Sequence, residues 1–427
     1  MDNLYDILSE RGFIYQGTEE KALRDLLDRE QVKVYIGFDP TADSFHVGNM
    51  IPIMSLAWTQ RTGHIPIAII GGGTAMVGDP SGRTETRQII SLEEIRHNQE
   101  GLKKQLSRYF TFGQDQALMI NNADWLLDLK YVDFLREIGT HFSVNRMLAA
   151  ESYRLRLETG LSFLEFNYML LQAYDFYILF RDYGCVLQMG GQDQWGNIVA
   201  GIDLIRRLTG QTAYGLTFPL LMTSANQKFG KTHAGSVWLD KQQTSPYEFY
   251  QFWRNSDDSD LGRFLGLFTF LPLDEVQTLG SLQGSLINRA KEVLAYEATA
   301  ITHGHEAARQ AFLASIKTFG QADPEGQVKT SSRIADITLE LPAELPTTSS
   351  TPEELKKYPT AADLFVLVGL AKSKSEARRL IRGGGGYINN RRVDKEDQVY
   401  TLDDFKDNAL LLRAGKKRYH RILIASD

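Results

Sequence analysis

Short apolar runs alternate with longer helical stretches over the first 240 or so residues, and this alternation constrains the fold more than any other feature. Residues 32–38 alternate as a strand does, and residues 65–70, 185–189 and 216–221 are compact apolar runs. Strands that alternate with helical segments are typical of a parallel sheet with crossover helices. We therefore predict an α/β fold with a Rossmann-like parallel-sheet catalytic domain over residues 1–240.

Each of these runs leads into a loop that is rich in polar residues or glycine. Asp39-Pro40-Thr41 follows the first run, Gly71-Gly72-Gly73 and then Asp79 follow the second, and residues 190–194 follow the third. The fourth leads toward a lysine-rich segment that begins at Lys228. Ligands of open α/β sheets bind outside the carboxyl ends of the strands, so we expect these loops to line one crevice.

Two common nucleotide signatures do not fit the glycine-rich loops. The run Gly71-Gly72-Gly73 lacks the third glycine of the dinucleotide fingerprint, because Met76 stands at that position. Gly230-Lys231-Thr232 is not a P-loop, since Ala225 stands where the first glycine is required. The triple glycine is as consistent with a tight turn as with a ligand contact.

Two other segments have the composition of phosphate-binding loops. The first is His46-Val47-Gly48-Asn49 and the second is Lys228-Phe229-Gly230-Lys231-Thr232. Either segment alone is usually a solvated connection, but together they supply donors for a nucleotide. Their combination indicates an enzyme that activates a small molecule with ATP.

A predicted helix carries a stripe of polar residues that is a candidate pocket for a second substrate. Between Phe163 and Phe180, a helical repeat of about 3.6 residues places Tyr168, Gln172 and Asp175 on one face. The rest of this segment is apolar, as in a buried helix. Buried polar groups need partners, so the stripe is either a structural network or a site for a small polar ligand. The neighbouring loops favour the ligand.

The remainder of the chain divides by composition. Residues 241–340 are mostly helical and predict a helical domain. Residues 341–359 carry four of the twelve prolines and predict a linker. From Lys356 onward, 16 Lys and Arg stand against 9 Asp and Glu, a net +7, although the whole chain carries −6. A basic tail on an acidic body indicates a polyanionic partner for residues 360–427.

Composition excludes several other classes of protein. One cysteine, Cys185, rules out an intramolecular disulfide and fits a reducing cytoplasm. We find neither a signal peptide nor a membrane-spanning run, so we expect a cytoplasmic protein. His303-Gly304-His305 lacks further ligands and is interpreted as a solvated helix end, so we predict no protein-bound metal.

The order and spacing of these residues resemble those of bacterial tyrosyl-tRNA synthetases, which are class I aminoacyl-tRNA synthetases. His46 to Asn49 resembles the first class signature, with Asn49 in place of its second histidine, and Lys228 to Thr232 resembles the second signature in the form of the tyrosine branch. The match extends over nearly the whole chain. It implies activation of L-tyrosine to tyrosyl-adenylate and transfer to tRNA(Tyr), with ATP and Mg²⁺.

The resemblance also implies roles for individual residues. It implies tyrosine contacts from Tyr35, Asp79, Tyr168, Gln172, Asp175 and Gln188. It implies ATP or adenylate contacts from Gly37, Asp39, Gly48, Gly191, Asp193, Gln194 and Lys231. It implies catalytic positions at Thr41, His46, Asn49, Lys228, Lys231, Thr232, Arg83 and Arg87.

The C-terminal region resembles an S4-type RNA-binding α+β domain. Residues 375–382 read as a basic helix stopped by glycine, and residues 387–393 read as a short strand. The expected RNA contacts are Arg378, Arg379, Arg382, Arg391 and Arg392. The resemblance implies that the helical domain of residues 241–340 binds the tRNA anticodon region. It also implies a homodimer that shares each tRNA. Two alternatives are a related class I enzyme, such as a tryptophanyl-tRNA synthetase, and a non-catalytic RNA-binding protein built on a synthetase scaffold.

Overall fold

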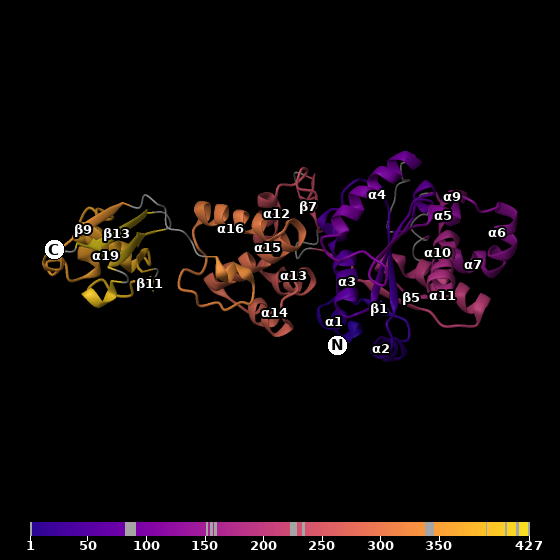
Figure 1. Ribbon diagram of the computed structural model, residues 1–427, viewed down its shortest axis with the longest axis horizontal. Coiled ribbons are helices and arrows are strands. Elements are labelled where there is room, and N and C mark those ends of the chain that lie inside the picture. The colour runs from indigo at the N-terminus through magenta and orange to yellow at the C-terminus, as the bar shows by residue number, and fades with distance from the viewer. Residues whose placement is uncertain are drawn as a thin grey trace.

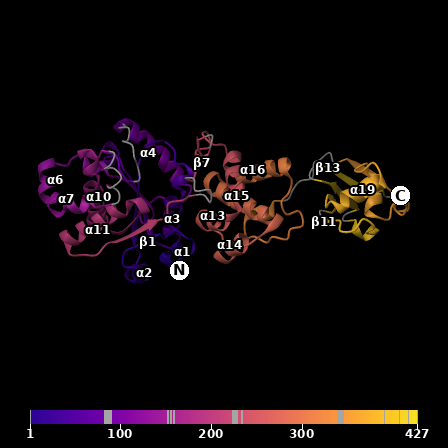
Figure 2. The same ribbon diagram turned by 180° about the vertical axis from the view of Figure 1, so that it is seen from behind.

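The structure is a computed structural model of the 427-residue chain. It describes residues 2–81, 91–150, 153, 157, 160–222, 229–232, 235–337, 346–389, 391–405, 408–415 and 418–425. Three bodies follow one another along the long axis, with the first 240 or so residues at one end and the C-terminal sheet at the other (Figures 1 and 2).

The first body is built on a six-stranded sheet, as the alternation of strands and helices predicts. Its strands are β1 (Gln16–Gly17), β2 (Lys33–Phe38), β3 (Ile65–Ile70), β4 (Leu118–Asn121), β5 (Cys185–Gly191) and β6 (Tyr214–Phe218), in the order β1-β6-β5-β2-β3-β4. All pairs are parallel except β1 with β6. The chain reverses its direction of winding between β2 and β5, and this is where ligands of such sheets bind.

Helices cover both faces of this sheet (Figure 1). The larger ones are α2 (Glu20–Arg29), α3 (Met50–Arg61), α4 (Leu92–Leu106), α10 (Tyr168–Tyr183) and α11 (Trp195–Thr209). Short helices complete the body at its outer end: α5 (Ala123–Leu126), α6 (Tyr131–Glu137), α7 (Val144–Leu148) and α9 (Phe163–Phe166). The predicted polar helix is therefore two helices, because the capping box at Ser162 starts α9 and the chain restarts at Tyr168.

The second body is helical, and its hydrophobic core is continuous with that of the first. Its helices are α12 (Pro246–Arg254), α13 (Leu261–Phe268), α14 (Leu273–Gly280), α15 (Ile287–His303) and α16 (His305–Phe319). One buried cluster joins Trp253 and Phe268 of this body to Met54 of α3. Arg11, just after α1 (Leu4–Glu10), donates to the carbonyl oxygens of Gly266, Thr269 and Leu271 at the end of α13. These contacts fix the two bodies to each other.

The third body corrects the predicted linker. Its five-stranded sheet has the order β11-β10-β12-β13-β9, and β9 (Thr347–Ser350) pairs in parallel with β13 (Arg418–Ile424). Residues 347–359 therefore belong to the C-terminal body, and α17 (Pro352–Leu355) follows β9 directly. The prediction failed because the Thr/Ser tract looks like a linker, whereas its pairing partner lies about seventy residues away.

The remaining elements of the third body form one compact core. They are α18 (Ala361–Leu367), α19 (Lys374–Arg382), β10 (Gly386–Ile388), β11 (Arg391–Arg392) and β12 (Ala409–Ala414). The predicted strand at 387–393 is a hairpin, in which Tyr387 pairs with Arg392. Within the described residues, no helix is long and apolar enough to cross a membrane.

Candidate active site

A cavity of about 1540 Å³ opens at the carboxyl ends of β2 and β5. It is lined by every predicted site residue of the first body whose side chain the structure describes. These are Tyr35, Gly37, Asp39, Thr41, His46, Gly48, Asn49, Asp79, Tyr168, Gln172, Asp175, Gln188, Gly191, Asp193 and Gln194. The alternation of strands and polar loops thus predicted one crevice correctly.

The structure does not describe the side chains of five predicted site residues. Arg83, Arg87 and Lys228 lie outside the described residues. Lys231 and Thr232 form strand β7 (Lys231–Thr232), which pairs with β8 (Gly235–Ser236), and only their backbone is described. Their neighbours Phe229 and Gly230 line the cavity.

Tyr35 and Asp175 form a buried pair of polar groups, 1% and 3% exposed. The Asp175 carboxylate accepts a hydrogen bond from Asn122 Nδ2 at 2.8 Å and another from Trp125 Nε1 at 2.8 Å. Burial nevertheless raises the pKa of Asp175 to about 7, and burial beside Asp175 raises the pKa of Tyr35 well above its ordinary value. The Tyr35 hydroxyl has no hydrogen-bond partner among the described residues. These two groups suit a ligand that carries both a donor and an acceptor, such as a phenol.

Asn122 and Trp125 are functional candidates that the sequence analysis did not find. Asn122 directly follows β4, accepts from Gly73 N at 2.8 Å and also donates to Thr74 Oγ1 at 3.0 Å. It therefore ties the glycine-rich turn after β3 to Asp175. The signal that could have identified it is its place after a strand, but residues 118–121 are too short an apolar run to stand out.

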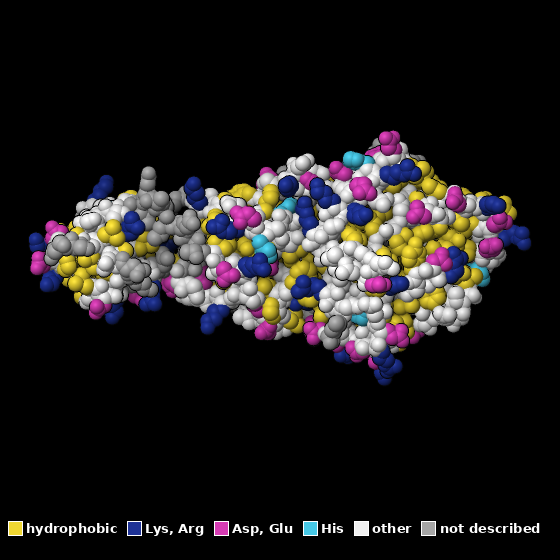
Figure 3. Space-filling view, viewed as in Figure 1, with side chains coloured by type: hydrophobic (Ala, Val, Ile, Leu, Met, Phe, Trp, Pro, Cys, Tyr) yellow, Lys and Arg dark blue, Asp and Glu magenta, His cyan; other side chains and the backbone are white. Residues whose placement is uncertain are grey.

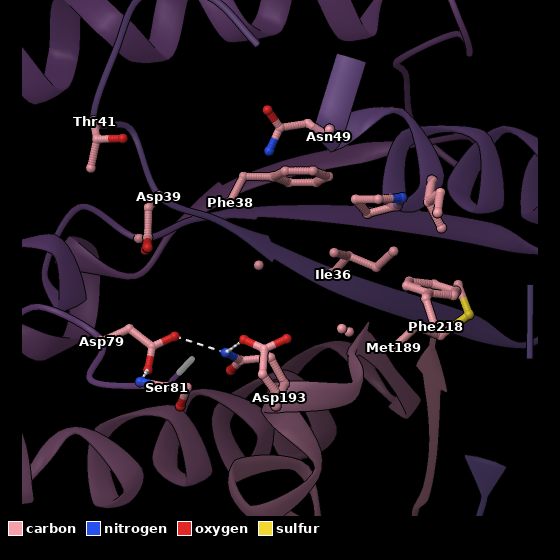
Figure 4. Close-up of a pocket in the computed structure, with 18 of the residues that line it drawn as sticks. Ile36, Phe38, Asp39, Thr41, Asn49, Asp79, Ser81, Met189, Asp193 and Phe218 are labelled. Carbon is pink, nitrogen blue, oxygen red and sulfur yellow. Dashed lines mark hydrogen bonds between the residues drawn. The ribbon is translucent and has the colours of Figure 1, made fainter. Parts of the chain in front are cut away.

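A second polar network lines the other wall of the cavity (Figure 4). Asp79 accepts from Ser81 N at 2.9 Å and from Gln194 Nε2 at 2.8 Å. Asn197, on α11, donates to Gln172 Oε1 at 3.0 Å and to Gln194 Oε1 at 3.2 Å. Burial, with a smaller contribution from nearby Asp39, raises the pKa of Asp79 to about 6. Asp79 is therefore mostly ionised at neutral pH and suits a cation.

The two predicted signature segments meet at the mouth of the cavity. His46 and Asn49 form a capping box, in which His46 Nδ1 accepts from Gly48 N at 3.0 Å and Asn49 Oδ1 accepts from His46 N at 3.1 Å. Gly230 has a positive φ of 84°, and a Cβ there would lie 2.6 Å from Val47 Cγ2. Only glycine allows both the backbone conformation and this close approach.

Phe229 anchors the second segment in the core shared with the helical body. Its ring packs against Phe252, Trp253, Phe264 and Phe268, with centroid separations from 4.9 to 5.7 Å. The phenylalanine of this signature is thus a structural anchor for the lysine-rich loop.

Comparison with known proteins decides the family. A family model described as class I tRNA synthetases (W and Y) matches residues 27–320, and one for the tyrosine–tRNA ligase SYY-like C-terminal domain matches residues 340–422. The tyrosine–tRNA ligase of Desulfatibacillum aliphaticivorans is 54% identical over 426 residues, 99% of each chain. The chain belongs to the tyrosine–tRNA ligase family. The corresponding ligase of Desulfosudis oleivorans is 55% identical over 428 residues, again 99% of each chain.

Solved structures agree with this assignment. A C-terminally truncated mitochondrial tyrosyl-tRNA synthetase from Aspergillus nidulans has a TM-score of 0.67 at 30% identity, over 75% of this chain and 95% of that one. The predicted family, fold class and enzyme class are confirmed. The synthetase is therefore an aminoacyl-tRNA ligase with ATP as a substrate.

The C-terminal body places the predicted RNA-binding arginines on its surface. Arg378, Arg379 and Arg382 are exposed on α19, and Arg391 and Arg392 are exposed on β11. Helix α19 begins at Lys374, one residue before the predicted start at Ser375, and Ser373 is its N-cap. Glu396 lies 3.9 Å from Arg378 and 3.6 Å from Arg382.

Two smaller predictions have mixed outcomes. Cys185 is fully buried in β5, as expected for a strand core residue. His303 is not a solvated helix end, because its ring is half-buried and packs edge-on against Phe249 at 4.9 Å. Gly304 separates α15 from α16, and His305 at the start of α16 is exposed.

Proposed function

We propose that this synthetase converts L-tyrosine and ATP to tyrosyl-adenylate and pyrophosphate, and then transfers the tyrosyl group to the 3′ end of tRNA(Tyr). The observation that carries the proposal is the pairing of Tyr35 and Asp175 within the same cavity as the two signature segments. No covalent bond to the protein is required, so the protein acts by positioning the reactants and stabilising charge.

Tyr35 and Asp175 recognise the phenolic hydroxyl of the substrate. The Asp175 carboxylate accepts its proton in a hydrogen bond, and Tyr35 supplies a second polar contact. Phenylalanine would leave both buried groups without a partner, which costs about 1–3 kcal/mol for each. Asn122 and Trp125 position Asp175 for this task.

The α-ammonium group of tyrosine binds at the second network. Asp79 supplies the negative charge, Tyr168 and Gln172 supply acceptors, and Gln188 completes the surrounding shell. The Oε1 atom of Gln188 is buried without a partner among the described residues, which supports a ligand contact there.

ATP occupies the mouth of the cavity. Gly37, Gly48 and Gly191 allow close approach of the backbone, while Asp39, Asp193 and Gln194 contact the adenylate. In the transition state the departing pyrophosphate is stabilised by Thr41, His46, Asn49, Lys228, Lys231, Thr232, Arg83 and Arg87. Magnesium enters with the ATP phosphates and needs no all-protein cage.

The test is amino-acid-dependent exchange between ATP and pyrophosphate, with tyrosine, phenylalanine and tryptophan measured in parallel. We expect exchange with tyrosine alone. Exchange with tryptophan in place of tyrosine would assign the chain to the tryptophan branch of the same family model. Absence of exchange with all three, from folded protein, would favour a non-catalytic RNA-binding protein.

We also propose a homodimer, formed through an apolar surface at the outer end of the first body. Figure 3 shows hydrophobic side chains gathered over that end. Exposed members are Leu127, Tyr131, Val132, Leu135, Val144, Phe163 and Leu164, from α6, α7, α9 and the loop after α5, with Phe163 69% exposed. Such patches mark association surfaces. Phe163→Asp should yield a monomer in analytical ultracentrifugation, whereas an unchanged mass would reject this surface.

The C-terminal body binds tRNA through backbone contacts from its five exposed arginines. Such contacts depend on salt, because each neutralised phosphate releases counterions. Replacing Arg378 and Arg382 by Gln should weaken tRNA binding and reduce its salt dependence. We also propose that the synthetase is cytoplasmic, and its single cysteine supports this location.

A further inference from the structure

A buried face of α4 contacts the segment that joins β2 to the first signature. Asn98 and Gln105 are only 5% and 3% exposed, although both are polar. With Gly101 they stand at positions i, i+3 and i+7, which places all three on one side of the helix. None of these three residues belongs to the predicted site.

The side chains of Asn98 and Gln105 donate to, or accept from, residues 40–45. Asn98 Nδ2 donates to Pro40 O at 2.9 Å, Phe45 N donates to Gln105 Oε1 at 2.9 Å, and Gln105 Nε2 donates to Ser44 Oγ at 2.9 Å. Backbone groups in buried irregular segments need such partners. The two amides therefore satisfy both ends of a segment that has no regular secondary structure.

Gly101 allows the segment to lie directly against α4. A Cβ at this position would stand 2.2 Å from Asp43 O, well inside van der Waals contact. A glycine inside a helix is unfavourable by about 1 kcal/mol relative to alanine, so its presence is explained here by the close approach. Residues 40–45 therefore contact α4 at Asn98, Gly101 and Gln105.

The opposite side of the segment is held by the chain that follows the second signature. Leu239 N donates to Phe45 O at 2.8 Å, and Val47 N donates to Val237 O at 2.9 Å. Thr41 lies within residues 40–45, His46 directly follows them, and both residues line the cavity. Thr41 itself is exposed, so its position depends on the backbone that carries it.

The far end of α4 is fixed to the helical body. Arg108 Nη1 donates to Thr302 O at 2.8 Å, and the Tyr109 hydroxyl lies 2.9 Å from Thr302 Oγ1. The helix is therefore a fixed support for the segment.

We propose that Asn98 and Gln105 are positioning residues for the ATP half of the reaction, acting through residues 40–45 on Thr41 and His46. This inference rests on the proposed function. Displacing phosphate-facing groups by about 1 Å can slow a reaction by about 100-fold. Loss of either amide should therefore lower the rate of adenylate formation, whereas tyrosine binds at a different wall of the cavity and should be unaffected.

The experiment compares Gln105→Met and Asn98→Leu with the control Gln60→Met in the full chain. Gln60 makes a matched pair of contacts, in which Nε2 donates to Thr111 O and Oε1 accepts from Thr111 N, both at 2.8 Å, but it does not contact residues 40–45. For each variant the readouts are kcat and KM for ATP in pyrophosphate exchange, the Kd for tyrosine by equilibrium dialysis, and urea unfolding.

We expect kcat to fall about 10- to 100-fold in Gln105→Met and Asn98→Leu, with the Kd for tyrosine within about twofold of wild type. The control should keep the wild-type rate. Rates within about twofold of the control in both folded variants would overturn the proposal, as would a loss of tyrosine affinity equal to the loss of rate.

A second variant covers the case in which the amide variants do not fold. Gly101→Ala adds one methyl group against Asp43 O and favours the helix itself, so it displaces the segment without removing a hydrogen bond. We expect the same fall in kcat. An unchanged rate in Gly101→Ala would overturn the proposal. Failure of wild type to catalyse exchange would instead reject the proposed function, which separates the two results.

Discussion

The substitution Asp175→Asn tests both the proposed role of Asp175 in substrate recognition and its effect on the stability of the ligand-free protein. Burial raises its pKa from 3.8 to about 7, even though hydrogen bonds from Asn122 and Trp125 act to lower it. Between these two pKa values the folded protein binds more protons than the unfolded chain. The free energy of unfolding therefore falls as pH rises through this range.

The size of this effect follows from the shift. A shift of about 3 pKa units corresponds to about 4 kcal/mol once the pH exceeds the folded-state pKa. For wild type, the free energy of unfolding should decrease by about 2 kcal/mol between about pH 5.5 and about pH 8 as Asp175 ionises. Asparagine does not ionise, but its amide group faces one of the two donors and adds a pH-independent penalty of about 1–3 kcal/mol.

The assay is urea unfolding of wild type and Asp175→Asn at both pH values. We expect the stability of the variant relative to wild type to increase by about 2 kcal/mol from the lower to the higher pH. Asp274→Asn, on the surface of α14, controls for the loss of a surface charge. A difference between variant and wild type that is the same at both pH values would refute the reasoning. In pyrophosphate exchange, the preference of the variant for tyrosine over phenylalanine should fall at least about tenfold.

Three further predictions concern the signature contact, the junction between bodies and the ammonium site. Gly230→Ala places a methyl group against Val47 at positive φ, so it should cost about 1–2 kcal/mol in urea unfolding and slow pyrophosphate exchange; full activity would contradict the contact. Arg11→Met leaves three carbonyl oxygens without their donor and should lower the free energy of unfolding by about 3 kcal/mol. Arg24→Met, at an exposed ion pair, should change it by about 0–1 kcal/mol, and equal effects would reject the role of Arg11. Because the pKa of Asp79 is about 6 and a protonated carboxyl cannot hold a cation, kcat/KM for tyrosine should decrease as pH falls through about 6, and a flat pH profile would contradict this.

The first body was predictable because local sequence determines most of it. Strands at 33–38, 65–70 and 185–191 lie within a residue or two of their predicted bounds, and their polar loops meet as the rule for parallel sheets requires. The polar stripe of Tyr168, Gln172 and Asp175 faces the cavity for the same reason, since helical spacing fixes which residues share a side.

The missed features depend on contacts between distant residues. β9 forms only because β13 lies beside it, so its Thr/Ser composition carried no signal. Asn122 reaches Asp175 across 53 positions, and Asn98 reaches Pro40 across 58. Most polar residues on helices are exposed to solvent. The sequence pattern around Asn98 therefore does not show that this residue is buried; its burial becomes evident only from the position of residues 40–45 in the fold.

Contacts between distant residues position buried polar groups in the cavity that do not have a full set of hydrogen-bond or charge partners. Asp79 and Asp175 are buried with raised pKa values, and the Tyr35 hydroxyl and Gln188 Oε1 are buried without partners among the described residues. Such groups destabilise a folded chain unless a ligand pairs with them. In the function we propose, tyrosine supplies the complementary atoms at opposite ends: its ammonium group pairs with Asp79, and its hydroxyl pairs with Tyr35 and Asp175. The buried polar groups that would recognise the substrate therefore lower the stability of the free protein. The side-chain amides of Asn122 and Gln194 donate hydrogen bonds to Asp175 and Asp79, and Asn197 donates to Gln194, so these amides position both carboxylates in the absence of substrate.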